Sequence, residues 1–236
     1  MTSLFAAAAV FLGIHLLVSG TRLRDTITAA IGERSYLALF SLASFAAITW
    51  LALAYNAVRA SGRDMVLYAP WSGIPYLAIP LVAVAFLLAV PGLLVSNPTA
   101  LGQENAAAKG VLVKGVLRIT RHPFLWGVAI WGAIHLAANG DLASVIFFGT
   151  FALLALAGTA AIDAKRKRKM GPAWDAFAAN TSNIPFGAMV AGSDHFKWKE
   201  LLDWRVLAAI LLFSTILIFH DRLFGVSPFP GGWLPH

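Results

Sequence analysis

Long apolar runs and short polar loops alternate along the chain. Six of the apolar runs approach the length of about 20 residues that a helix needs to cross the hydrocarbon core of a bilayer. They cover residues 3–20, 36–55, 75–96, 122–139, 142–162 and 205–224. The pattern therefore predicts an all-α fold, a polytopic transmembrane helix bundle with about six spans, built as a single membrane domain over residues 1–236.

Two features predict how the runs are joined and bent. The third run contains Pro75, Pro80 and Pro91, so we expect a kinked helix that packs closely against its neighbours. The fourth and fifth runs are separated by Asn139-Gly140-Asp141, a tight-turn sequence. We therefore expect these two helices to form an antiparallel hairpin.

The largest segment outside the apolar runs covers residues 163–204. It starts at Asp163 and continues with five consecutive basic residues, Lys165 to Lys169. Trp174 and Phe177 then share one face of a short amphipathic helix expected around 172–180. Contact with anionic lipid is the first explanation for the basic residues, and binding of an anionic substrate group is the alternative.

Composition agrees with a membrane protein. The chain is 59% hydrophobic and 12% charged, about half the charged fraction of a soluble domain. A net charge of +7 would suit nucleic acid only as a basic face on a soluble module. Here the cations lie in loops between apolar runs, so the pattern argues against nucleic-acid binding.

The distribution of Lys and Arg predicts an orientation. Fifteen of the 18 lie in one set of loops and three in the other, and the richer set is expected in the cytoplasm. Both termini are then expected outside. The fifteen are Arg22, Arg24, Arg34, Lys109, Lys114, Arg118, Arg121, Lys165, Arg166, Lys167, Arg168, Lys169, Lys197, Lys199 and Arg205; the three are Arg59, Arg63 and Arg222.

The absence of cysteine excludes disulfides, thiolate metal sites, cysteine nucleophiles and thiolate-ligated haem. The first residues also lack the basic segment of a signal peptide. We therefore expect the first apolar run to remain as a helix.

Two histidines lie within apolar runs, His15 in the first and His135 in the fourth. A titratable group at membrane depth is costly and points to function. The alternative is a histidine bonded to a carbonyl of a neighbouring helix. Gly127 and Gly132 leave room beside His135 for a flat ligand or for another helix.

A third histidine, His122, stands between Arg121 and Pro123 at the start of the fourth run. Proline suits the first turn of a helix, so His122 is expected at or near the N-cap. The positive end of the helix dipole there favours a neutral imidazole and a docked anion. A plain capping or interface role is the alternative. His220, near the end of the last run, is a reserve ligand, and His195 and His236 are expected to have no special role.

Histidines on different apolar helices, without cysteine or clustered carboxylates, favour haem over zinc or non-haem iron. Hard metals prefer carboxylate oxygens, and zinc sites gather more nitrogen or sulfur donors.

Several segments together resemble a known family. The main segment is Arg-Ile-Thr-Arg-His-Pro at 118–123, followed by Trp131, His135 and Asn139-Gly140. Further matches are Asn97-Pro98-Thr99-Ala100-Leu101-Gly102, Thr181-Ser182-Asn183-Ile184-Pro185-Phe186, His15, and His220 with Phe224-Gly225. Over nearly its whole length the chain is similar to the NnrU family, which includes the cis-zeta-carotene isomerases.

The resemblance implies a multi-pass protein of the cell inner membrane that binds haem b. It implies an isomerase that turns a cis double bond of an apolar polyene, such as zeta-carotene, to trans, with an electron donor as a possible partner. The axial ligands would be His15 and His135, with His122 or His220 in reserve. His122 and Arg121 would take the catalytic positions.

Two departures from the family pattern stand out. Gly132 replaces a cysteine of the plant isomerases, which excludes a thiolate ligand, and Asn56 lies near the position of a further histidine. Depth also opposes the ligand pair. His135 is 13 residues beyond His122, roughly 20 Å along a helix, whereas His15 is expected in the cytoplasmic half of its own helix. Pairing of His15 with His122 is the alternative.

Two other functions stay open. Bacterial relatives are associated with nitric oxide and denitrification, so a haem-based sensor or redox protein is one. Arg121-His122-Pro123 with Gly127 also resembles the isoprenylcysteine carboxyl methyltransferases. Those enzymes carry paired glutamates where this chain has only Asp163.

Overall fold

The computed structural model of the chain describes residues 1–100, 103 and 113–229. Throughout that part the fold is helical, apart from one isolated antiparallel bridge between Val66 and Asp141. Three parts of the sequence analysis lie outside the described residues: Lys109, His236, and Leu101-Gly102 at the end of the matching segment 97–102.

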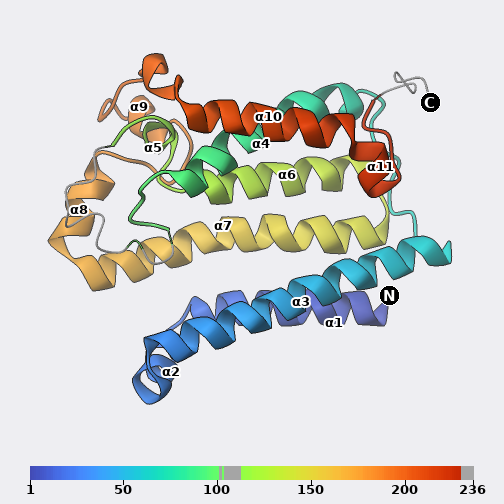
Figure 1. Cartoon of the computed structure of the whole chain (residues 1–236), viewed down its shortest axis with the longest axis horizontal. Helices are drawn as coiled ribbons and strands as arrows, with labels where there is room; N and C mark the ends of the chain where they lie inside the picture. Colours follow the sequence, from blue (N-terminus) through green and yellow to red (C-terminus); the bar gives the residue numbers. More distant parts are fainter. Residues whose placement is uncertain (101–102, 104–112, 230–236) are drawn as a thin grey trace.

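The N-terminal third forms a layer of its own along one side of the molecule (Figure 1). Helix α1, Thr2–Leu12, continues into a π-helical segment, Gly13–Ser19, and α2, Leu23–Ile31, leads into the long helix α3, Glu33–Ser61. The small side chains on α1 and α3 let these helices pack closely. The resulting core also includes Ala143 at the start of α7, and its α1 and α3 members are Leu4, Ala7, Ala8, Phe11, Ala47, Leu51, Ala54 and Val58.

The remaining long helices are α4, Ile74–Leu94, α6, Pro123–Asn139, α7, Leu142–Met170, and α10, Trp204–Ile218. Helix α6 packs between α4 and α7, α10 packs on α4, and α7 also contacts α1 and α3 (Figure 1). Helix α4 continues through Pro80 and Pro91.

Glycines set how closely α6 approaches its neighbours. A Cβ on Gly127 would lie 2.5 Å from the carbonyl oxygen of Ala85 on α4, and one on Gly132 would lie 2.8 Å from that of Phe148 on α7. Neighbouring helices therefore fill the space at both glycines. Of the two predicted occupants, a flat ligand or another helix, the structure has the helix.

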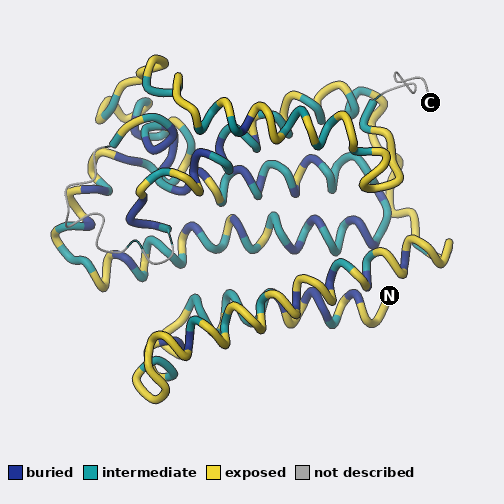
Figure 2. The backbone as a smooth tube through the Cα atoms, in the orientation of Figure 1, coloured by how far each residue is buried: buried dark blue, intermediate teal, exposed yellow. Residues whose placement is uncertain are grey.

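Among the described residues, four helices are long and apolar enough to cross a membrane: Thr2–Ser19, Glu33–Ser61, Ile74–Leu94 and Leu142–Met170. They correspond to the first, second, third and fifth predicted spans. Helix α6 has 17 residues and α10 has 15, so the count of six spans and the orientation of the termini stay predictions. The outward faces are exposed along these helices (Figure 2), for example at Leu42 and Phe45, which are 68% and 69% exposed. Apolar faces of this size suit contact with lipid.

The expected hairpin is confirmed. Gly140 ends α6 with φ 76°, a left-handed conformation that favours glycine, and the Asp141 side chain caps α7 by accepting a hydrogen bond from the Ser144 amide at 2.8 Å. The expected short helix is confirmed as α8, Pro172–Ala179, with Trp174 and Phe177 both buried.

One boundary differs from the prediction. Helix α7 continues to Met170, so Lys165 to Lys169 lie on a helix and not in a loop. Lysine and arginine are good helix formers and are favoured in a last turn, and the helix ends only at Gly171, where φ is 53°. The remaining described elements are short: α5, Val116–Ile119, α9, Gly187–Val190, a 3₁₀ turn, Trp198–Leu201, and α11, His220–Phe224.

Candidate functional site

The start of α6 is shaped by the Thr120 to Pro123 segment. Thr120 ends α5 in an extended conformation, His122 is the N-cap residue of α6, and Pro123 occupies the first turn. The predicted N-cap position of His122 is therefore confirmed. Since proline cannot donate from its backbone nitrogen, it suits a turn whose amides have no partner within the helix.

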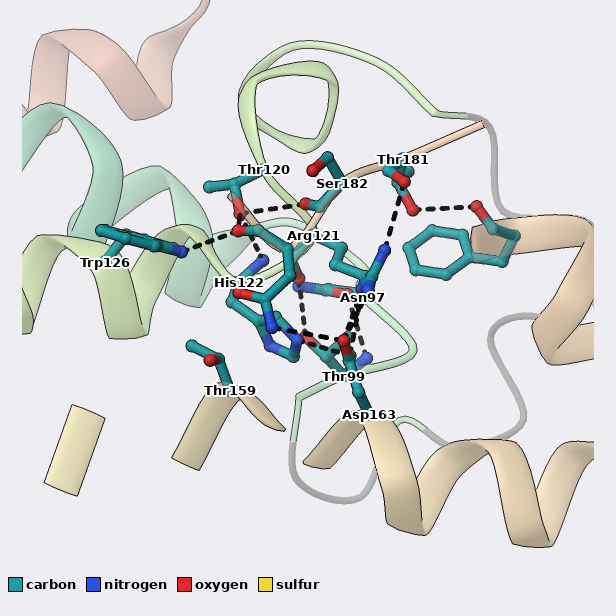
Figure 3. A network of polar contacts seen from close by, with 12 residues as sticks. Asn97, Thr99, Thr120, Arg121, His122, Trp126, Thr159, Asp163, Thr181 and Ser182 are labelled. Atoms are coloured by element: carbon teal, nitrogen blue, oxygen red, sulfur yellow. Dashed lines mark hydrogen bonds and ion pairs between the residues drawn. The ribbon is translucent and has the colours of Figure 1, made fainter. Parts of the chain in front are cut away.

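Asp163, on α7, binds both residues of this segment that the sequence singles out (Figure 3). His122 Nε2 lies 2.7 Å from Asp163 Oδ1. The Arg121 guanidinium donates from Nε to the same carboxylate at 3.0 and 3.1 Å, and from Nη1 to the Thr181 carbonyl at 3.1 Å. Asn183 adds a longer bond to Asp163 Oδ2 at 3.3 Å. The carboxylate thus occupies the place at the helix start where an anion was expected.

Main-chain bonds join two further segments to Arg121 (Figure 3). Its amide donates to the Ser182 carbonyl at 2.8 Å. Its carbonyl accepts from Asn97 Nδ2 at 3.0 Å and from Thr99 Oγ1 at 2.9 Å. The residues around 97–99, 118–123 and 181–183, which are far apart in the sequence, therefore meet at one point against α7.

His122 is 2% exposed, and its Nδ1 has no hydrogen-bond partner among the described residues. Burial lowers the pKa of His122 because it penalises the charged imidazolium, and the bond to Asp163 opposes this shift only in part. A neutral imidazole that donates from Nε2 to Asp163 keeps a lone pair on Nδ1. That nitrogen is able to accept a proton or a hydrogen bond.

His135 lies near the other end of α6, in an aromatic environment. Its Nδ1 lies 2.8 Å from the carbonyl oxygen of Trp131, one turn earlier on the same helix. Its ring stacks on Phe148 of α7, with centroids 4.9 Å apart. The carbonyl belongs to the same helix. The structural role considered from the sequence was a hydrogen bond to a carbonyl of a neighbouring helix.

His15 and His220 hold their rings in the same way. His15 Nδ1 lies 2.8 Å from the Phe11 carbonyl oxygen, and His220 Nδ1 lies 2.7 Å from that of Val226. His15 also belongs to the π-helical segment, a distortion that is frequent at functional sites. No described residue bonds to Nε2 of His15, His135 or His220.

His15 and His135 do not share one level of the bundle. Phe11 packs against Phe151 of α7, with centroids 5.6 Å apart, and His15 follows one turn later. Since His135 stacks on Phe148, the two histidines are offset by roughly 10 Å along α7.

The sequence missed most of the polar site around Arg121. It noted Asp163 only as the start of the 163–204 segment and as a mismatch to the methyltransferases, and Asn97, Thr181 and Asn183 only as parts of matching segments. The useful signal was that Asn97 and Asp163 are polar residues directly after the ends of apolar runs; the segment 181–183, in the middle of 163–204, had no such signal. Within the described residues no group of three or more His, Cys, Asp or Glu side chains is placed to hold a metal ion.

Comparison with known proteins gives a family. A family model described as NnrU protein matches residues 3–228, nearly the whole chain. No curated protein and no solved structure matches the chain significantly.

Proposed function

Since the chain belongs to the NnrU family, we propose that it is a haem-b-binding membrane protein that isomerises a cis double bond of an apolar polyene, such as zeta-carotene, to trans. One observation carries the proposal. His15, His135 and His220 each direct Nδ1 to a main-chain carbonyl and leave Nε2 without a described partner. This is the arrangement of an imidazole whose second nitrogen ligates iron.

His135 is the ligand that we propose first. Its ring packs against both Trp131 and Phe148, and an apolar, aromatic shell suits a porphyrin. The resemblance assigns His15 to the second axial position, but its offset from His135 along α7 favours the reserve ligand His220, whose Nδ1 is also held by a main-chain carbonyl. When bound, the haem would supply a redox-active iron next to the polyene.

His122 and Arg121 lie at the opposite end of α6, roughly 20 Å from His135 by helix length. This distance argues against the catalytic role expected for them. We propose instead that they are positioning residues, because all three guanidinium nitrogens of Arg121 are engaged by Asp163 and Thr181. They fix the start of α6, and with it the register of His135.

The test is an absorbance and pyridine-haemochrome spectrum of the detergent-purified protein, oxidised and reduced, after haem supply during expression. We expect a Soret band in the wild type that His135→Ala abolishes. His220→Ala and His15→Ala identify the second ligand, because only the true ligand shifts the band. His195→Ala, in an exposed position, is the matched control. A wild-type protein without Soret absorbance would sink the proposal.

Isomerisation needs its own assay. The haem-loaded protein, with a chemical reductant in place of the electron donor, is incubated with a cis polyene in micelles, and the isomers are separated by chromatography. Reversible nitric oxide binding without polyene turnover would favour the sensor or redox function. Tight binding of S-adenosylmethionine would favour a methyltransferase.

A further inference from the structure

A cleft of about 550 Å³ opens between the start of α2 and the end of α7. It is lined by Arg22, Asp25 and Thr26 from one side and by Lys165, Arg168 and Lys169 from the other. None of these six residues belongs to the histidine and aspartate sites described above.

The charge of the cleft is unbalanced. Lys165, Arg168 and Lys169 are three and four residues apart, so they share one face of α7, where like charges repel. Asp25 is the single carboxylate among the six, and it is already within 4.0 Å of Lys169 and 3.9 Å of Arg24. Four cations therefore face one carboxylate that is shared with a fifth cation, and a bound anion would relieve their repulsion.

The wall on the α2 side is held in place from behind. Arg24 is 3% exposed, pairs with Glu33 of α3, and lies over the Tyr36 ring at 5.3 Å. These contacts fix α2 to α3, so the α2 wall of the cleft does not depend on a bound molecule to keep its position. A preformed cleft loses less free energy to ordering when it binds a ligand.

The position of the cleft indicates what kind of anion it binds. It lies just beyond the ends of two apolar segments, Thr2–Ser19 and the apolar part of Leu142–Met170. Leu23 and Ile31 of α2 are 47% and 42% exposed, so α2 presents apolar side chains next to the cationic ones. Basic clusters at the edge of a membrane span bind acidic headgroups, and guanidinium groups match the oxygens of phosphate.

We propose that this cleft is a binding site for an anionic phosphate group, carried by an acidic phospholipid headgroup or present as free phosphate. The volume falls within the range of about 300–1,000 Å³ that small-molecule sites occupy. Arg22 and Arg168 are the principal ligands, because both are exposed and lie on opposite walls of the cleft.

The test measures ligand-dependent thermal stabilisation of the full-length protein in a neutral detergent. Three probes are titrated separately: dihexanoyl phosphatidylglycerol, dihexanoyl phosphatidylcholine and inorganic phosphate. The site variant is Arg22→Gln with Arg168→Gln. The matched control is Arg34→Gln with Lys167→Gln, which removes two exposed cations that do not line the cleft. Arg22→Lys with Arg168→Lys keeps the charge and shows whether the site variant fails through loss of charge.

We expect stabilisation by phosphatidylglycerol that the site variant weakens about thirtyfold in apparent affinity, at about one kcal/mol for each cation. The control and the lysine variant should stay close to the wild type. Stabilisation by inorganic phosphate with the same dependence on the site variant identifies free phosphate as the ligand. The proposal fails if the site variant and the control respond alike to every probe, or if the wild type responds to none of the anionic probes.

Discussion

His122 Nε2 lies 2.7 Å from Asp163 Oδ1, and this contact joins the start of α6 to the basic end of α7. Both oxygens of the same carboxylate accept hydrogen bonds from the Arg121 guanidinium. The Asp163 side chain is 19% exposed, so water screens these charges only in part. Asp163 is therefore the acceptor on which the segments around Arg121 depend.

Asp163→Asn should destabilise the protein, because an amide cannot accept both branches of the guanidinium and leaves Arg121 and His122 short of a partner. Breaking a mostly buried ion pair from one side costs about 3 kcal/mol or more, and partial exposure brings the expected loss to about 2 kcal/mol. The thermal midpoint in detergent, followed by tryptophan fluorescence, should fall by about 5 °C. Asp175→Asn, at an exposed position on α8, should leave it nearly unchanged, and an equal midpoint in both variants would contradict this role of Asp163.

Acid should destabilise the protein through His122. Its pKa in the folded state is lower than the ordinary value of 6.5, so the unfolded chain takes up a proton that the folded chain does not. Stability from this group is complete above about pH 6.5 and declines as the pH falls below it. The thermal midpoint of the wild type should therefore decrease between pH 7.5 and 5.5.

The His122→Gln variant isolates this effect, because glutamine keeps an N–H donor and does not titrate. Its midpoint should change less with pH over the same range, whereas His195→Gln, at an exposed position, should keep the wild-type slope. If His122→Gln retains the full wild-type slope, the pH dependence comes from another group.

Much of the fold could be predicted from periodicity and turn chemistry. The apolar runs gave the long helices, Asn139-Gly140-Asp141 gave the hairpin, and Trp174 with Phe177 gave α8. The end of α7 was predicted too early, because a charged segment was assigned to a loop although lysine and arginine continue a helix readily. Length alone did not separate α6 and α10, at 17 and 15 residues, from full-length spans.

For the site around Arg121 and His122, the sequence predicted the local position of single residues but not their contacts with distant segments. The sequence placed His122 at the N-cap because Pro123 fixes the helix start, a purely local effect. It could not bring Asp163 to His122, or Asn97 to Arg121, because those contacts depend on tertiary packing between residues 41 and 24 positions apart in the sequence. For the same reason it could not decide whether Gly132 faces a ligand or α7.

Gly127→Ala should lower the thermal midpoint, because the new Cβ would lie 2.5 Å from the Ala85 carbonyl oxygen and 2.7 Å from the Ala89 Cβ. Helix α4 must then move away from α6, and overpacking of this kind costs about 1–3 kcal/mol. Gly158→Ala on α7 is the matched control, since its Cβ would meet only Leu125 at 3.6 Å. That variant should be neutral or slightly stabilising, because alanine favours helix over glycine. The close α4–α6 contact is wrong if Gly127→Ala is as stable as Gly158→Ala.

Arg118 anchors the segment that leads into α10. Its guanidinium donates to Glu200 from Nε at 2.8 Å and from Nη2 at 3.1 Å, and it also pairs with Asp194. This two-pronged contact raises the pKa of Arg118 and lowers that of Glu200, the bond between them being the largest cause in each case. Lysine carries the same charge but cannot make the planar, paired contact.

Arg118→Lys should therefore loosen residues 194–200 without unfolding the helices. Amide hydrogen exchange in that segment should accelerate severalfold, while exchange in α6 and α7 stays at the wild-type rate. Lys197→Arg replaces lysine by arginine at an exposed position of the same segment. It controls for a general effect of substitution and should not alter exchange. Unchanged protection of residues 194–200 in Arg118→Lys would mean that the charge alone, and not the paired geometry, holds this segment against α5.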